Sequence, residues 1–153
     1  MAATSARSAF LLSYVDDERE MYGAALWAAG FLVTVFLDPL LALEQALSSH
    51  PDVLVARVLQ PGQAIDGIEL TRRLRSDRRT DRLGVVLITS HIEPAYRDAA
   101  LGAGCDEFLL LPALPSDVVA ASHRAATRRG SMAIHQPPDT LSAARATRVN
   151  RRA

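Results

Sequence analysis

Short apolar runs alternate with amphipathic segments along most of the chain. The apolar runs cover residues 9–12, 31–36, 53–58, 84–90 and 107–111. Runs of this length, without regular polar alternation, are typical of strands that are buried on both faces. The pattern therefore predicts five buried strands.

Capping and turn residues predict a helix after each strand. Asp17 and Glu20 have capping-box spacing, so the first helix is expected from about residue 18 to residue 30. Asp38 as N-cap and Pro39 at the first helical position predict the second helix. Its buried face is expected to carry Leu40, Leu43 and Leu47.

Capping-box spacing and proline positions also predict the remaining helices. Asp66 and Glu69 repeat the capping-box spacing, and Pro94 stands in the first turn of the next segment. These helices are expected over residues 68–77, 93–104 and 116–128. Five strand–helix units predict an α/β fold with a parallel sheet covered on both faces. Right-handed crossovers favour the flavodoxin-like doubly wound order 2-1-3-4-5.

Composition narrows the class of protein. The chain has 49% hydrophobic but only 5% aromatic residues, so its core must be aliphatic. It has 17 basic and 17 acidic residues, and this balance gives no global attraction to nucleic acid or to an anionic membrane. The single cysteine, Cys105, excludes an internal disulfide and is expected to be a buried inert thiol. No apolar run reaches the roughly 18 residues of a membrane span, and no secretion signal is visible, so a cytoplasmic protein is expected.

The chain is expected to have one domain with two terminal extensions. Residues 1–7 should be a flexible N-terminus, residues 8–128 the domain, and residues 129–153 a disordered tail. The tail carries Arg145, Arg148, Arg151 and Arg152 against one acid, Asp139. A solvated tail is the simpler interpretation, and weak binding to phosphate groups or to another anionic partner is the alternative.

In this topology a ligand site lies beyond the carboxyl ends of the strands. The residues delivered there are Ser13, Tyr14, Arg57, Thr89 and Leu111. A charged Arg57 at the end of an otherwise apolar strand is the unusual member of this set.

Several segments, together with the order of elements, resemble a response-regulator receiver domain over roughly residues 9–128. They are "REMYGAALWAAGF", "PDVLVARVLQPG", "RRLRSDRRTDRLGVVLITS" and "ALGAGCDEFLLLP". The resemblance implies a phosphoryl group taken from a histidine kinase onto an aspartate with the help of Mg²⁺. It also implies a signalling face made by the fourth helix, the fifth strand and the fifth helix.

Each functional position of the family can be located in this sequence. The acceptor aspartate falls on Arg57, and the lysine after the fifth strand falls on Leu111. The hydroxyl position after the fourth strand is matched by Thr89, and the aromatic switch position by Phe108. The family's cis peptide bond would fall between Leu111 and Pro112.

The two acidic residues that hold the metal ion in the family can be aligned with this sequence in two ways. Without a gap, the pair falls on Ser13 and Tyr14, neither of which is acidic. Asp16 and Asp17 look like that pair, but helix capping explains them more simply. A metal site at Asp16 and Asp17 stays open as the alternative.

The charges that remain argue against metal and phosphoryl chemistry. The aligned positions Ser13, Tyr14, Arg57 and Leu111 sum to plus one. A dication about 4 Å from a guanidinium would be repelled by roughly 8 kcal/mol at an effective dielectric near 20. We therefore expect no magnesium cofactor and no phosphorylation at the usual position. The Arg57 guanidinium should lie in water or against Asp16 or Asp17; alternatively, a permanent cation binds an anion or holds one conformation.

These expectations combine into one predicted function. The chain should be a stand-alone receiver-like signalling domain, not an enzyme, that acts through protein–protein contacts. The expected partners are a histidine kinase or another response regulator, with a homodimer through the fourth helix, fifth strand and fifth helix. No membrane association is expected. Two alternatives remain: a phosphate-accepting receiver that uses Asp16, Asp17 or another carboxylate, and a nucleic-acid or anionic-partner binder that acts through the tail.

Overall fold

A single five-stranded parallel sheet forms the centre of the computed structural model, which describes residues 6–135, with side chains to residue 130. The strand order β2-β1-β3-β4-β5 confirms the predicted flavodoxin-like topology. Each strand differs from its predicted range by one residue at one end. The strands are β1 Ser8–Leu12, β2 Leu32–Phe36, β3 Val53–Arg57, β4 Gly84–Thr89 and β5 Glu107–Leu110.

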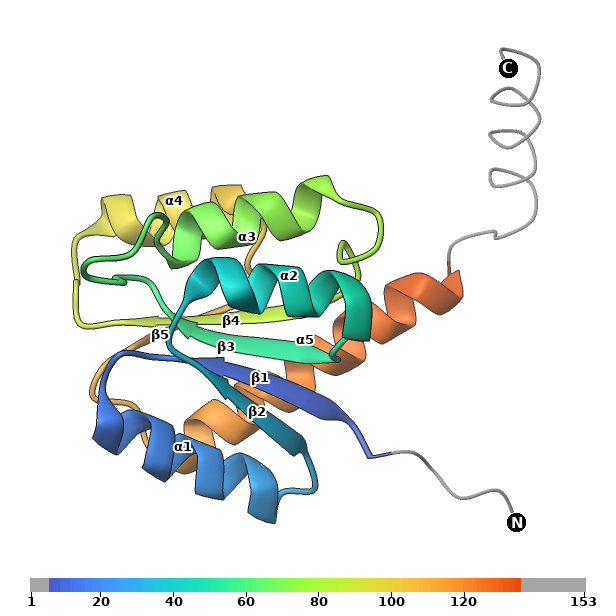
Figure 1. Ribbon diagram of the computed structural model, residues 1–153, viewed down its shortest axis with the longest axis horizontal. Helices are drawn as coiled ribbons and strands as arrows, with labels where there is room; N and C mark the ends of the chain where they lie inside the picture. The colour runs from blue at the N-terminus through green and yellow to red at the C-terminus, as the bar shows by residue number, and fades with distance from the viewer. Residues whose placement is uncertain (1–5, 136–153) are drawn as a thin grey trace.

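Five helices cover the two faces of this sheet. They are α1 Asp16–Ala28, α2 Pro39–Ser49, α3 Gly67–Ser76, α4 Pro94–Ala103 and α5 Pro115–His135. Helices α2, α3 and α4 lie on one face, and α1 and α5 lie on the other (Figure 1). A search of the described helices for a membrane-spanning segment finds none.

Two apolar layers hold the helices to the sheet. Within β1, Phe10 and Leu12 belong to the layer beneath α2, α3 and α4, whereas Ala9 and Leu11 belong to the layer beneath α1 and α5. Because successive side chains of a strand point to opposite faces, both sets are buried, which explains the unbroken apolar runs in the sequence.

Two of the predicted helix starts are confirmed by their caps. The Asp38 carboxylate accepts a hydrogen bond from the Leu40 N–H at 2.9 Å, and Asp66 accepts one from the Glu69 N–H at 2.8 Å. Both bonds satisfy N–H groups that have no partner within the first helical turn.

The predicted capping box of the first helix is wrong. Helix α1 begins at Asp16 rather than residue 18, and its N-cap, Val15, makes no side-chain capping bond. Asp16 and Asp17 are helical residues of the first turn, where negative charge stabilises the amino end of the helix dipole. With this earlier start, Glu18 is the third residue of the helix.

The predicted leucine face of α2 is confirmed only in part. Leu43 packs against the apolar layer, but Leu40 is 39% exposed, and the buried residues of this helix are Pro39, Ala42 and Ala46. Small side chains at the contact let the helix approach the sheet closely, whereas leucines there would hold it away.

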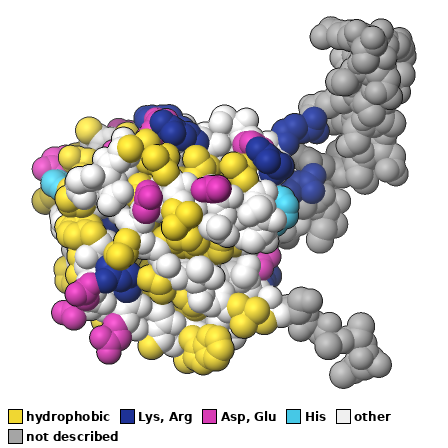
Figure 2. Space-filling model, in the orientation of Figure 1, with side chains coloured by type: hydrophobic (Ala, Val, Ile, Leu, Met, Phe, Trp, Pro, Cys, Tyr) yellow, Lys and Arg dark blue, Asp and Glu magenta, His cyan; other side chains and the backbone are white. Residues whose placement is uncertain are grey.

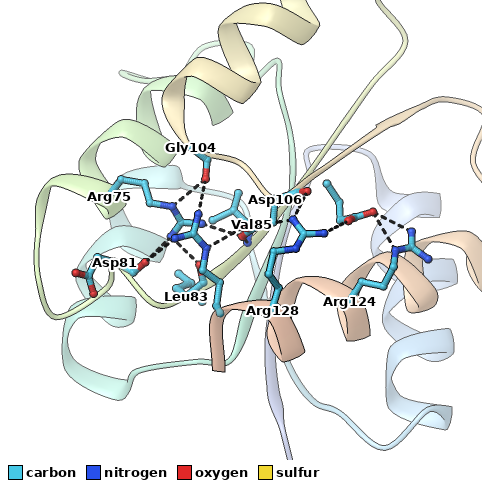
Figure 3. A network of polar contacts seen from close by, with 10 residues as sticks. Arg75, Asp81, Leu83, Val85, Gly104, Asp106, Arg124 and Arg128 are labelled. Carbon is cyan, nitrogen blue, oxygen red and sulfur yellow. Dashed lines mark hydrogen bonds and ion pairs between the residues drawn. The ribbon is translucent and has the colours of Figure 1, made fainter. Parts of the chain in front are cut away.

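A buried network fastens the end of α5 to the amino end of β5 (Figure 3). The Asp106 carboxylate accepts hydrogen bonds from Arg75 Nη2 at 2.9 Å, Arg129 Nε at 2.7 Å and the Val85 N–H at 2.8 Å. Burial, together with the charge of Arg129, lowers the pKa of Arg75 to about 10, so this guanidinium is still charged at neutral pH.

This network corrects the predicted end of the last helix. Helix α5 continues to His135 instead of ending at residue 128, and Arg129 is part of its attachment. The remainder of the predicted tail, including Arg145, Arg148, Arg151, Arg152 and Asp139, lies outside the described residues, as do residues 1–5 of the predicted flexible N-terminus.

Candidate functional site

The residues predicted for the site lie at the carboxyl edge of the sheet. Leu12 pairs with Ala56 and Arg57 pairs with Ile88, so Ser13, Arg57 and Thr89 arrive at the same edge. The Leu111 N–H donates to the Thr89 carbonyl oxygen at 2.8 Å, which places the end of β5 beside them.

Arg57 is held by a two-pronged ion pair with Glu18. Arg57 Nε donates to Glu18 Oε1 at 2.8 Å, and Arg57 Nη2 donates to Glu18 Oε2 at 2.9 Å. The side chains are only 13% and 11% exposed. The Ser13 hydroxyl donates to the same Oε1 at 2.8 Å. Both carboxylate oxygens of Glu18 are therefore engaged, and the bond to Glu18 raises the pKa of Arg57.

Glu18 corrects the predicted charge of the pocket. The four aligned positions sum to plus one, but the Glu18 carboxylate adds minus one, so the pocket is neutral. The prediction of a cationic pocket is therefore wrong, because the Arg57 guanidinium is matched by a carboxylate. The Glu18 carboxylate is bound to this guanidinium at the end of β3.

Tyr14 and Arg19 complete the surroundings of the ion pair. The Arg57 guanidinium carbon lies 5.2 Å from the centroid of the Tyr14 ring, within the range of a cation–π contact. Arg57 Nη1 also lies 3.4 Å from the Tyr14 hydroxyl oxygen. Arg19 Nη1 donates to the Ser13 carbonyl oxygen at 2.7 Å, which fixes the loop after β1.

The backbone of Arg57 is fixed as closely as its side chain. Gln60 Nε2 donates to the Arg57 carbonyl oxygen at 2.9 Å. A Cβ atom at Gly67 would lie 2.5 Å from that oxygen, so only glycine allows α3 to begin against the end of β3. This close approach explains why a glycine directly follows Asp66 in the sequence.

Asp16 and Asp17 do not enter the pocket. Both are exposed at the start of α1, and the Asp16 side chain, 89% exposed, pairs with Arg19. The prediction that one of them would receive Arg57 is wrong, because the partner is Glu18, one position further along the helix.

The switch positions have local contacts of their own. Thr89 is buried, and its hydroxyl oxygen accepts a hydrogen bond from the His91 N–H at 3.1 Å. Phe108 is partly buried against the apolar layer beneath α2, α3 and α4. Leu111 packs against the opposite layer, and the peptide bond between Leu111 and Pro112 is cis.

The residues present do not fit the magnesium ion that the fold family implies. Mg²⁺ needs near-octahedral oxygen coordination, and proteins usually hold it through one or two free carboxylates together with water molecules. In this pocket Glu18 is the carboxylate, and its oxygens accept from Arg57 and Ser13. Across the described residues, no three His, Cys, Asp or Glu side chains lie together as a metal site.

Glu18 was not predicted as a pocket residue, although the predicted first helix already contained it. In the structure Glu18, Tyr22 and Leu26 are the buried residues of α1. Their spacing of four places them on one helical stripe, and that spacing is visible in the sequence. A glutamate at the top of an apolar stripe is the signal that could have found the partner of Arg57.

Cys105 shows the behaviour expected of a structural thiol. It is buried, and burial together with the charge of Asp106 raises the pKa of the thiol to about 11. The reactive thiolate is therefore scarce at neutral pH.

Comparisons with known proteins point to one family. Residues 14–123 match the model of the response regulator receiver domain. The response regulator MprA of Mycobacterium ulcerans (strain Agy99) is 33% identical over 131 residues, which cover 84% of this chain and 54% of that protein. MprA of Mycobacterium leprae (strain TN) is 36% identical over 101 residues, or 64% and 42% of the two chains. The chain thus spans about half the length of these relatives.

Solved structures agree with this assignment. A putative response regulator from Chloroflexus aurantiacus J-10-fl superposes with a TM-score of 0.74 at 27% identity, covering 80% of this chain and 99% of that one. The receiver domain of the sensor histidine kinase PA1611 from Pseudomonas aeruginosa PAO1, which has a magnesium ion in its active-site cleft, shares the fold with a TM-score of 0.72, 20% identity and the same coverage. Together with the strand order and the family match, these findings show that the chain belongs to the response regulator receiver domain family.

Proposed function

We propose that this receiver domain is not phosphorylated at the usual position and signals by protein–protein recognition. One observation carries the proposal: the acceptor position is occupied by Arg57, whose guanidinium is bound by Glu18. A guanidinium has no lone pair available to accept a phosphoryl group at neutral pH.

The rest of the pocket supports the same proposal. A carboxylate would have to be free to hold a metal ion, whereas both Glu18 oxygens accept hydrogen bonds from Arg57 or Ser13. Leu111 offers an alkyl chain where the family supplies an ammonium group. The domain would therefore work without Mg²⁺, unlike the PA1611 receiver in its solved structure.

The surface formed by α4, β5 and α5 is the proposed site for a partner. Ile92, Leu101, Leu110 and Leu114 on or beside these elements are between 44% and 76% exposed. These exposed apolar side chains offer contact area for a protein partner. We assign this face to a histidine kinase or another response regulator.

Intact-mass measurement tests the chemical part of the proposal. The full chain is incubated with acetyl phosphate and Mg²⁺, and a receiver domain that retains the acceptor aspartate serves as the positive control. We expect the control to gain the mass of one phosphoryl group and this chain to gain none.

The alternative acceptor is tested in the same experiment. A stable mass gain on this chain that is lost in Asp16→Ala or Asp17→Ala would overturn the proposal and establish the phosphate-accepting alternative. A gain that survives both substitutions would also overturn it, and would place the acceptor on another carboxylate.

A further inference from the structure

The β2 edge of the sheet is open to solvent. Strand β2 pairs with β1 on one side, and its other side has no neighbouring strand in the described sheet. Leu32 is 53% exposed and Val35 is 46% exposed. Figure 2 shows hydrophobic side chains over β2 and the adjoining parts of α1 and α2.

The two edge strands of the sheet differ in their charged residues. At the β5 edge, Glu107 pairs with Arg124 and Arg128, each at 2.8 Å. The β2 edge consists of Leu, Val, Thr, Val and Phe, with no charge and no proline. Because natural proteins protect exposed edges with charges or proline, an unprotected edge indicates a surface that is covered in use.

The backbone groups available on this edge can be identified. The Leu32 N–H donates to the Arg7 carbonyl oxygen at 2.8 Å, so Leu32 faces β1. Since backbone groups alternate in direction along a strand, those of Thr34 and Phe36 also face β1. The N–H and C=O groups of Val33 and Val35 therefore point outward.

The strand is complementary to itself when it runs antiparallel. A two-fold axis at Thr34 places Leu32 opposite Phe36 of the second copy, and Val33 opposite Val35 of the second copy. The outward backbone groups of Val33 and Val35 then face each other and can exchange hydrogen bonds in both directions. No other register on a two-fold axis uses all four of these outward groups in hydrogen-bonded pairs.

The side chains also suit a second copy of the same strand. Two threonines meet at the axis, a favourable cross-strand pair, and no like charges oppose each other. Neither helix layer closes the edge, because Thr34 is exposed on the α2 side and Val35 on the α1 side. Identical surfaces that meet in this way form the isologous interface of a two-fold dimer.

We propose that the β2 edge is the docking site for a second copy of this chain, by antiparallel pairing centred on Thr34. This surface is distinct from the α4, β5 and α5 face, which stays free for another partner. The inference does not depend on the state of the phosphorylation pocket.

Oxidative cross-linking of full-chain variants that each add one cysteine to the buried Cys105 tests the register. In Thr34→Cys the two thiols would lie opposite each other, where Cβ atoms are about 4.5–5.5 Å apart. In the matched control Leu32→Cys, the two thiols would be four residues out of register, roughly 13 Å apart. We expect a disulfide-linked dimer from Thr34→Cys and not from Leu32→Cys. Equal cross-linking of both variants, or of neither, would overturn the proposal.

Sedimentation equilibrium without cross-linking gives a second readout. Thr34→Lys places two ammonium groups at the axis and should weaken dimerisation by roughly tenfold or more, because like charges directly opposite are destabilising. Leu110→Lys, on β5, should leave the dimer unchanged. If only Leu110→Lys loses the dimer, the interface lies on the α4, β5 and α5 face. If the wild-type chain is monomeric, the β2 edge does not bind a second copy. Either result contradicts the proposal.

Discussion

At the residue scale, the pairing of Arg57 with Glu18 decides what the pocket can do. A buried ion pair is not strong evidence for stability in itself, because desolvation offsets the attraction. The pair instead bears on the proposed chemistry of the pocket. Both Glu18 oxygens accept hydrogen bonds from Arg57, and we propose that this pairing keeps the carboxylate from a metal ion.

The first prediction concerns this pair. Arg57→Ala leaves the Glu18 carboxylate buried without its partner, so it should lower the free energy of unfolding by about 3–5 kcal/mol. Asp16→Ala, at an exposed position of the same helix, should change it by less than about 0.5 kcal/mol. Urea unfolding of both variants measures the difference.

The double variant supplies the control for this prediction. Because Arg57→Ala with Glu18→Ala removes both charges, it should be less destabilised than the sum of the two single variants. If Arg57→Ala were no more costly than Asp16→Ala, the ion pair would not be an important contact of the pocket.

The sequence identified the unusual residue but not its partner. That Arg57 lies at a strand end followed from an apolar run and a Pro-Gly turn, which are local signals. That Glu18 receives it depends on how α1 packs on the sheet, and the predicted capping box of Asp17 and Glu20 gave the wrong start for this helix. Capping energies of about 1 kcal/mol are too small to decide such a boundary against tertiary packing.

At the element scale, the strands were predicted well because burial on both faces makes them uniformly apolar. The helix faces were less predictable. In α2 the contact is made by Ala42 and Ala46, while leucines, which carry more apolar surface, lie at its margins. A helix–sheet contact is set by how closely the backbones approach, and a count of apolar positions does not contain that information.

The end of α5 gives the prediction at this scale. Arg129 donates to the buried Asp106 carboxylate, so Arg129→Ala should lower the free energy of unfolding by about 1.5–3 kcal/mol, the range for a hydrogen bond to a charged group. Arg78→Ala, at an exposed position, should cost less than about 0.5 kcal/mol. Thermal and urea unfolding of the two variants are the measurements.

Because Arg75 and Arg128 remain near Asp106, the loss in Arg129→Ala should be partial. Equal stability of the two variants would show that the domain ends before Arg129, as the sequence had predicted. If only Arg129→Ala lowers the free energy of unfolding, the folded domain includes Arg129.

At the scale of the whole molecule, three surfaces have separate roles in this account. The carboxyl edge holds the neutral ion pair, the β2 edge offers a self-complementary strand, and the face of α4, β5 and α5 presents exposed apolar side chains. The topology that arranges them could be predicted from the order of elements alone. The predicted strand order also places β2 at an edge, but the exposure of its apolar side chains could not be predicted, because the apolar pattern of this strand is the same as that of a central one.

We propose that the pocket accepts neither a metal ion nor a phosphoryl group. The test is to record ¹H–¹⁵N spectra of the labelled full chain while Mg²⁺ and then beryllofluoride, a phosphoryl mimic, are added. We predict no saturable shifts for the backbone amides of Arg57, Thr89 and Phe108, because the Glu18 carboxylate is bound to the guanidinium. Saturable shifts of these amides that depend on Mg²⁺ would contradict the account.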